Sequence, residues 1–112
     1  MHLFSDGSHY WDMEDIWPLA NELEPFEIPV ASLMEVHEKV WGDITPYQCL
    51  EHWRRVMAAD LSYPVILGPD GRLIDGVHRA LKCISEMKTD IMAVRLIVMP
   101  EPKGTFEEFK RL

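Results

Sequence analysis

The sequence predicts a single compact α+β domain in which a small mixed sheet packs with helices. Short apolar runs that are typical of strands alternate along the chain with segments of helical spacing. A Gly-Pro-Asp-Gly turn at 68–71 joins two of these runs into a β-hairpin. The length of 112 residues and an apolar content of 47% suit one domain with one core. We expect residues 1–112 to form one domain with its core in residues 26–99.

The N-terminal 25 residues are expected to form an arm and a helix. Residues 1–12 have no clear apolar period, which indicates an extended arm with a short strand around position 10. Apolar residues between Ile16 and Leu23 have helical spacing. Because proline is tolerated best in the first turn of a helix, this helix should begin just before Pro18.

A strand is predicted at Phe26–Leu33, where apolar residues alternate with small or polar ones. Pro29 cannot donate a backbone hydrogen bond, so the strand should lie at a sheet edge or contain a bulge. Residues 34–44 indicate an irregular helical turn followed by a loop.

The next helix has the clearest start signal. Thr45 can act as N-cap, Pro46 suits the first helical position, and Gln48 completes a capping box. The helix should end near Asp60. One face is apolar and is expected to be buried, with the side chains of Cys49, Leu50, Trp53, Val56 and Met57.

The predicted hairpin joins strands at 64–67 and 72–74, and a helix follows at 76–87. Residues 90–99 predict a mostly buried final strand. The tail at 100–112 is expected to be a short amphipathic helix or a frayed end. The predicted core-facing stripe of the helix at 76–87 consists of Val77, Ala80, Leu81, Ile84 and Met87.

Charge and cysteine content restrict the classes of function. A net charge of −8 repels a phosphate backbone, so we do not expect nucleic-acid binding. Cys49 and Cys83 form no Cys-x-x-Cys pair and are expected to be buried free thiols in a reducing compartment. The sequence has no signal-peptide pattern and no apolar stretch of about 20 residues, so we expect a cytoplasmic protein that does not bind membranes.

The segment Asp75-Gly76-Val77-His78-Arg79 is the predicted site. A strand runs directly into a helix, and a helix N-terminus exposes backbone N–H groups and partial positive charge that can hold an anion. Gly76 should let a ligand approach the backbone. The cationic groups of His78, Arg79 and Lys82 oppose the helix dipole, and a bound phosphate would offset that cost.

Structural explanations exist for each of these residues. Asp75 is an adequate N-cap by itself. His78 can be an ordinary surface histidine, and Arg79 can pair with any of the 19 acidic residues of the chain. The prediction therefore depends on their combination after a hairpin.

Residues 64–82 resemble the central motif of the ParB/sulfiredoxin superfamily, a hairpin followed by Gly-x-His-Arg or Gly-x-Arg-Arg at a helix start. The order of strands over residues 26–99 is also similar. In that family the helix start binds nucleotide phosphates. The resemblance therefore implies a phosphate or nucleotide site formed by Asp75, Gly76, Val77, His78, Arg79 and Lys82.

Three branches of this family differ in activity. Sulfiredoxins carry a catalytic cysteine where this chain has Val77, so we do not expect sulfinic-acid reduction. ParB partition proteins continue into a DNA-binding domain, whereas this sequence stops at Leu112, so we do not expect centromere binding. ParB-like free serine kinases use an Asp-Gly-x-His-Arg segment close to the one found here.

The kinase branch implies catalytic candidates. Glu38, or alternatively Glu35, would be the base that accepts a hydroxyl proton. Asp75 would orient the hydroxyl or bind magnesium. The cofactor would be ATP or ADP, or else CTP, with magnesium. An acidic chain often has such glutamates on a solvated face, which is the alternative explanation for Glu35 and Glu38.

Three hypotheses of function follow. The first is a small nucleotide- or phosphate-binding protein, with phosphotransferase or nucleotide-hydrolysing activity as an extension. The second is a non-enzymatic interaction or regulatory module that binds a protein partner or a second copy. The third is a DNA-associated protein, which the net charge disfavours. An open basic concavity at Gly76 would favour the first hypothesis, and a filled site would favour the second.

Overall fold

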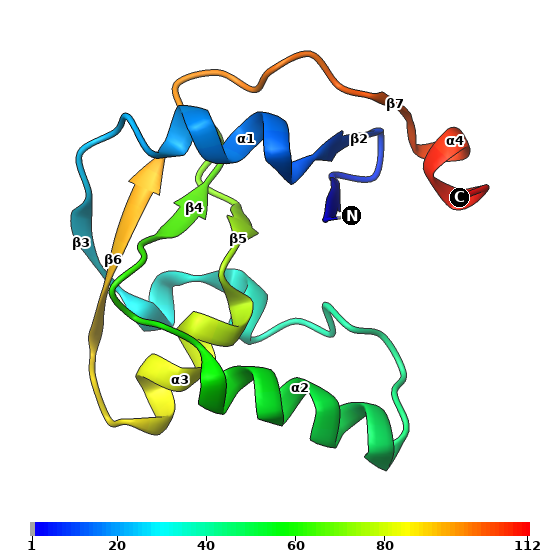
Figure 1. Ribbon diagram of the computed structural model, residues 1–112. Coiled ribbons are helices and arrows are strands. Elements are labelled where there is room, and N and C mark those ends of the chain that lie inside the picture. The colour runs from blue at the N-terminus through cyan, green and yellow to red at the C-terminus, as the bar shows by residue number, and fades with distance from the viewer. Residues whose placement is uncertain (1) are drawn as a thin grey trace.

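A four-stranded mixed sheet forms the centre of the computed structural model, which describes residues 2–112 (Figure 1). Its strand order is β3-β6-β4-β5. The strands are β3 (Phe26–Pro29), β6 (Asp90–Arg95), β4 (Val65–Leu67) and β5 (Leu73–Asp75). β6 pairs with β3 in antiparallel and with β4 in parallel orientation, while β4 and β5 form the predicted antiparallel hairpin. The predicted α+β class with a mixed sheet is therefore confirmed.

Helices and a second sheet cover the two faces of this sheet. α3 (Val77–Ser85) packs on one face, and α1 (Met13–Ala20) packs on the other, as Figure 1 shows. Side chains of β4 alternate between these layers, because successive residues of a strand point to opposite faces. Val65 and Leu67 belong to the cluster around α3, and Ile66 belongs to the cluster around α1.

The N-terminal arm contains more structure than the sequence indicates. β1 (Leu3–Ser5) and β2 (His9–Asp12) form an antiparallel hairpin, and β7 (Gly104–Thr105) adds a third strand to β2. The expected strand near position 10 is confirmed. The C-terminal tail closes on this sheet and ends in α4 (Phe106–Lys110), which is the predicted short helix. Local sequence patterns could not reveal a pairing between the two ends of the chain.

α1 begins earlier than predicted. Asp12 is its N-cap, and the Asp12 side chain accepts a hydrogen bond from the Glu14 backbone N–H. Pro18 consequently lies inside the helix, not in its first turn. The cap starts the helix at Met13, and burial of Met13, Ile16 and Ala20 holds it in place.

The predicted strand at 26–33 ends early. β3 stops at Pro29 and lies at the sheet edge, as its proline indicated. The chain then forms two short 3-10 helices, η1 (Val30–Ser32) and η2 (Met34–Val36). η1 replaces the end of the predicted strand, and η2 agrees with the irregular helical turn expected at 34–44. Val30 and Leu33 are buried against the sheet, so packing overrides the alternating pattern here.

α2 (Pro46–Ala58) has the predicted N-terminus but not the predicted buried face. Thr45 and Gln48 form the capping box, with Pro46 at the first position. Val56 is the one buried residue of this helix. The expectation for the rest of its apolar face is wrong, because Cys49, Leu50, Trp53 and Met57 are exposed. In Figure 1, α2 lies at the outside of the molecule, where α3 alone of the helices runs beside it.

The buried face of α3 is rotated relative to the prediction. Ala80 and Cys83 are buried, whereas Ile84 and Met87 are exposed. Leu81 is only half-buried. The expected burial of Cys83 is thus confirmed and that of Cys49 is wrong. Gly76, the N-cap of α3, has a positive φ. The apolar period of the sequence contains no information about the direction in which the helix leaves this residue.

The last strand is shorter and more exposed than predicted. β6 ends at Arg95, and Met92, Ile97 and Val98 are exposed. Met92 belongs to the strand that pairs with the short edge strand β3, so one face of β6 is incompletely covered at that point. None of the helices within residues 2–112 has the length and apolar character needed to cross a membrane.

Candidate functional site

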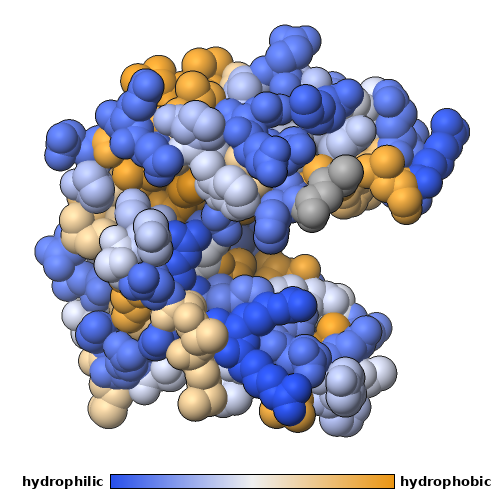
Figure 2. All heavy atoms as spheres, viewed as in Figure 1, coloured by the Kyte–Doolittle hydropathy of each residue, from blue (hydrophilic) through white to orange (hydrophobic). Residues whose placement is uncertain are grey.

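A cleft lies at the start of α3. Its main cavity has a volume of about 990 Å³ and is lined by residues of α1, α2 and the β5–α3 junction. A neighbouring cavity of about 740 Å³ lies along the hairpin turn and β1. Both cavities are lined by Val40, Ile74 and Val77, so they adjoin each other at these side chains. Figure 2 shows the hollow between the part that carries α1 and the part that carries α2.

The first turn of α3 opens into this cleft. Gly76 is the N-cap, and Ala80 N–H donates to its carbonyl oxygen at 2.8 Å. The backbone N–H groups of Val77, His78 and Arg79 therefore have no acceptor within the helix. No acidic residue occupies this turn, in contrast to the first turns of α1 and α4, which have two acidic residues each. These N–H groups are the donors on which the predicted anion site depends, and the site itself stays a prediction.

Gly76 is required for packing and backbone geometry. Its φ is +126°, a conformation that residues with a side chain rarely adopt. A Cβ atom there would lie 2.5 Å from Cγ1 of Val65 in β4. Gly76 also lines the main cavity, so the approach of a ligand to its backbone stays a prediction, and packing against Val65 is a second reason for this glycine.

Asp75 is held by two neighbours. Its Oδ2 accepts a hydrogen bond from the Trp17 indole N–H at 3.1 Å and lies 3.2 Å from Nη2 of Arg79. It makes no N-cap hydrogen bond. A guanidinium group beside this carboxylate does not suit magnesium, which would need the same oxygen atoms. Among residues 2–112, no three His, Cys, Asp or Glu side chains gather in a way that could hold a metal ion.

Arg79 connects three parts of the chain. Besides Asp75, its Nη1 donates to the backbone carbonyls of Tyr63 and Pro64, at 3.3 and 2.6 Å. Its side chain is largely buried. Arg79 lines the cleft, but its contacts mainly hold the segment between α2 and β4.

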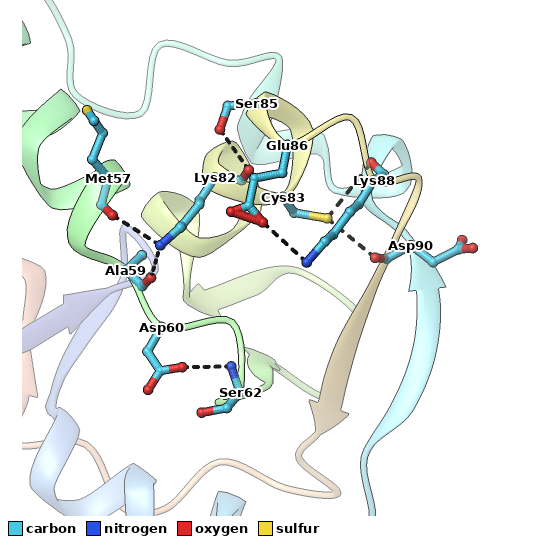
Figure 3. A network of polar contacts seen from close by, with 10 residues as sticks. All are labelled: Met57, Ala59, Asp60, Ser62, Lys82, Cys83, Ser85, Glu86, Lys88 and Asp90. Carbon is cyan, nitrogen blue, oxygen red and sulfur yellow. Dashed lines mark hydrogen bonds and ion pairs between the residues drawn. The ribbon is translucent and has the colours of Figure 1, made fainter.

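Lys82 does not reach the cleft. Its Nζ donates to the backbone carbonyls of Met57 and Ala59, at 3.0 and 2.6 Å (Figure 3). These carbonyls belong to the C-terminal end of α2, where a cation stabilises the unpaired carbonyls and the helix dipole. Lys82 is therefore engaged by α2 and does not line the main cavity, so this geometry gives no support to its predicted phosphate-binding role.

His78 belongs to a stack of three rings. His52 Nδ1 and His78 Nε2 lie 3.0 Å apart, which is hydrogen-bond distance. The Trp41 ring stacks on His52 with a centroid distance of 3.7 Å and an interplanar angle of 8°. Burial, and then the charges of His52 and Arg55, lower the pKa of His78 below 6.5. His78 is therefore a neutral hydrogen-bonding group near pH 7 and not the cation that the sequence indicated.

Both predicted bases pair with the same arginine. Glu35 Oε2 lies 2.5 Å from Arg72 Nε, and Glu38 Oε1 lies 2.8 Å from Arg72 Nη2. Glu35 is buried, and these two carboxylates raise the pKa of Arg72. Glu35 and Arg72 line the smaller cavity, on the far side of Val77 from the Asp75–Arg79 contact. A carboxylate that is engaged by a guanidinium is not free to meet a substrate hydroxyl, so this pairing does not favour general-base catalysis.

Three residues that line the main cavity, Trp17, Trp41 and Arg55, were not assigned to the site from the sequence, nor was His52, which stacks on Trp41. The sequence contains four tryptophans, for which base stacking in a pocket is one expectation beside core packing or a dimer interface. Arg55 lies on or near the border of the apolar face predicted for the helix that follows Thr45. In the structure its exposed side chain lines the main cavity. No pattern within the helix indicates that this arginine faces a cavity, because the opposing wall comes from α1 and the start of α3.

The chain matches no protein-family model, no curated protein and no solved structure. Membership of the ParB/sulfiredoxin superfamily therefore stays a prediction that rests on the motif in residues 64–82.

Proposed function

We propose that this chain is a ParB/sulfiredoxin-like protein that binds a phosphorylated small molecule, such as a nucleotide, in the cleft at the start of α3. The observation that carries this proposal is the position of the α3 N-terminus at the wall of a cavity of about 990 Å³. That volume is at the upper end of the range found for small-molecule sites, about 300–1,000 Å³.

Hydrogen-bond donors in the cleft support an anionic ligand. The N–H groups of the first turn of α3 would hold phosphate oxygens, assisted by the helix dipole. Arg55 projects from α2 into the same cavity, and its guanidinium group could form a bidentate contact with a phosphate. Neutral His78 would contribute one further donor. The Asp60 and Asp75 carboxylates also line the cavity and would restrict where the phosphate can sit.

The ring of Trp41 supports a ligand with an aromatic base. Trp41 lines the main cavity and already stacks on His52, so a planar group could extend the stack. ATP, ADP and CTP combine such a base with phosphates, which is why they remain the candidate ligands.

We propose binding without phosphoryl transfer. Glu35 and Glu38 are paired with Arg72, and Asp75 is held by Trp17 and Arg79. A transfer reaction would require one of these carboxylates to leave its partner before it could accept a proton. Magnesium is not part of the proposal, because Asp75 does not suit it.

The test is ligand binding to wild type and to two adjacent arginine variants. Thermal unfolding is measured with ATP, ADP, CTP, GTP or pyrophosphate, with and without magnesium. A ligand at 100 times its dissociation constant should stabilise the folded state by about 2.7 kcal/mol. Arg55→Gln should weaken the binding about tenfold or more, since a charge-assisted hydrogen bond contributes about 1.5–3 kcal/mol.

Arg54→Gln is the matched control. Arg54 is the preceding residue on the same exposed helix, pairs with Glu51 at 2.7 Å, and does not line the cavity. Its replacement should leave the affinity unchanged. The proposal is wrong if no ligand stabilises the protein, or if both variants lose the same affinity.

A non-enzymatic interaction module is the second candidate function. The exposed apolar side chains of α2 favour it, because large exposed apolar patches usually mark binding surfaces. This candidate would be supported if no ligand binds in the cleft and the exposed apolar side chains of α2 bind a partner.

A further inference from the structure

α2 presents an apolar stripe to solvent. The exposed fractions are 70% for Tyr47, 45% for Leu50, 48% for Trp53 and 65% for Met57. These positions are three or four residues apart, so they lie on one side of the helix over about 15 Å. Leu50, Trp53 and Met57 have the spacing of side chains at the seam between two packed helices. This stripe points away from Val56, the buried residue of α2.

Two opposite charges lie beside this stripe. Glu51 and Arg54 form an exposed ion pair at 2.7 Å on the flank of the helix next to Tyr47. Their positions lie equally far before and after the point between positions 52 and 53. The two ends of the stripe lie at similar distances from the same point, with Tyr47 before it and Met57 after it.

We propose that α2 is a homodimer interface, in which the stripe of one chain packs antiparallel against the same stripe of a second copy. A twofold axis between positions 52 and 53 brings the Leu50 and Trp53 side chains of both copies together. Tyr47 of each copy then approaches Met57 of the other. An interface between identical patches must be self-complementary, and this stripe satisfies that condition.

Charge complementarity identifies a second copy as the occupant. In the antiparallel arrangement, residues on the same flank of the two helices meet, so Glu51 of each copy faces Arg54 of the other. The intrachain ion pair is thereby converted into two interchain pairs. α2 has two arginines and one glutamate, so a second copy of a chain with net charge −8 meets no excess of negative charge at this helix.

Charge reversal tests the arrangement. Molar mass is measured by sedimentation equilibrium over a range of protein concentrations, and wild type should approach the mass of two chains. Glu51→Arg and Arg54→Glu each place like charges across the axis, and each should weaken dimerisation about tenfold or more. An equimolar mixture of these two variants should dimerise again, because every interchain pair then has opposite signs. The double variant should also dimerise.

An apolar substitution provides the second test. Leu50→Asp should abolish dimerisation, whereas Met87→Asp should not, because Met87 is 91% exposed and lies in the turn after α3. All of these residues are exposed or lie at the surface, so circular dichroism should show an unchanged fold.

A wild type that stays monomeric at every concentration would overturn the proposal. So would a mixture of the two charge variants that stays monomeric, since that result would mean that Glu51 and Arg54 do not meet across an axis. This inference is independent of ligand binding, because the stripe and the cleft lie on different sides of α2.

Discussion

The Trp17 indole N–H donates a hydrogen bond to Oδ2 of Asp75 at 3.1 Å, which connects α1 to the end of β5 across 58 positions of sequence. Asp75 in turn lies 3.2 Å from Arg79, the residue that holds the carbonyls of Tyr63 and Pro64. One wall of the cleft is therefore an interlocked polar network that joins four segments of the chain.

Trp17→Phe should destabilise the protein by about 0.5–1.5 kcal/mol, because it removes this donor while it keeps an aromatic ring. The measurement is urea denaturation. Tyr63→Phe is the control, since its exposed ring lies outside the apolar stripe of α2 and its change should alter stability by less than about 0.5 kcal/mol. Equal effects of the two substitutions would show that the Trp17–Asp75 hydrogen bond contributes nothing.

Gly76→Ala should destabilise the fold by about 2 kcal/mol or more. The substitution combines backbone strain at φ +126° with a contact of 2.5 Å between the new Cβ and Val65. Gly42→Ala separates the two effects, because Gly42 has φ +67° but no atom within 4 Å of the added Cβ. It should cost about 1 kcal/mol from strain alone. If thermal unfolding gives the same loss of stability for both variants, the contact between the new Cβ and Val65 is relieved without a further loss of stability.

Lys82→Met should reduce stability by about 1–2 kcal/mol, since it leaves the Met57 and Ala59 carbonyls without their charged donor. Lys88→Met removes an exposed ion pair with Glu86 and should cost less than about 1 kcal/mol. Any ligand of the cleft should bind Lys82→Met as it binds wild type. Loss of ligand affinity with unchanged stability would instead return Lys82 to the binding site.

Stability should fall as the pH decreases below about 6.5, because His78 is held neutral in the folded state. Burial, His52 and Arg55 lower its pKa below 6.5, so the unfolded chain binds this proton at a higher pH than the folded chain does. His78 therefore contributes its full stabilisation above 6.5, and that contribution is lost as the pH falls through the lowered pKa. Burial and then Arg55 also lower the pKa of His52, which has the same sign of effect.

Urea denaturation of wild type and His78→Asn, on both sides of the ordinary histidine pKa of 6.5, measures this effect. Wild type should lose more stability on acidification than the variant, although the nearby Asp75 carboxylate opposes the shift. If the stability of the two proteins depends on pH in the same way, His78 is not the source of that dependence.

Elements with a local cause were predictable. The capping box at Thr45 and Gln48 and the turn at 68–71 involve neighbouring residues, so the sequence contains the complete interaction. The start of α3 at Gly76 was also predictable, but the reason why this position requires glycine was not. Only the folded chain brings Val65 against that position.

The partners of the predicted site residues were not predictable. Lys82 has the sequence position of a phosphate ligand, yet its nearest acceptors are carbonyls of another helix. Glu35 and Glu38 were candidate bases, yet Arg72, in the hairpin, neutralises both. Which charged groups meet depends on the distance between elements, and spacing along the chain contains no information about that distance.

The amino-acid order alone was sufficient for the α+β class, the hairpin, and the helix starts at Thr45 and Gly76, because turns, caps and apolar periods act over a few residues. Packing between distant elements was needed to establish which face of α2 is buried, which groups hold Asp75, and that Arg55 lines the cleft. Burial and polar pairing are properties of three-dimensional contact, so a helix with a clear apolar stripe can still leave that stripe in solvent.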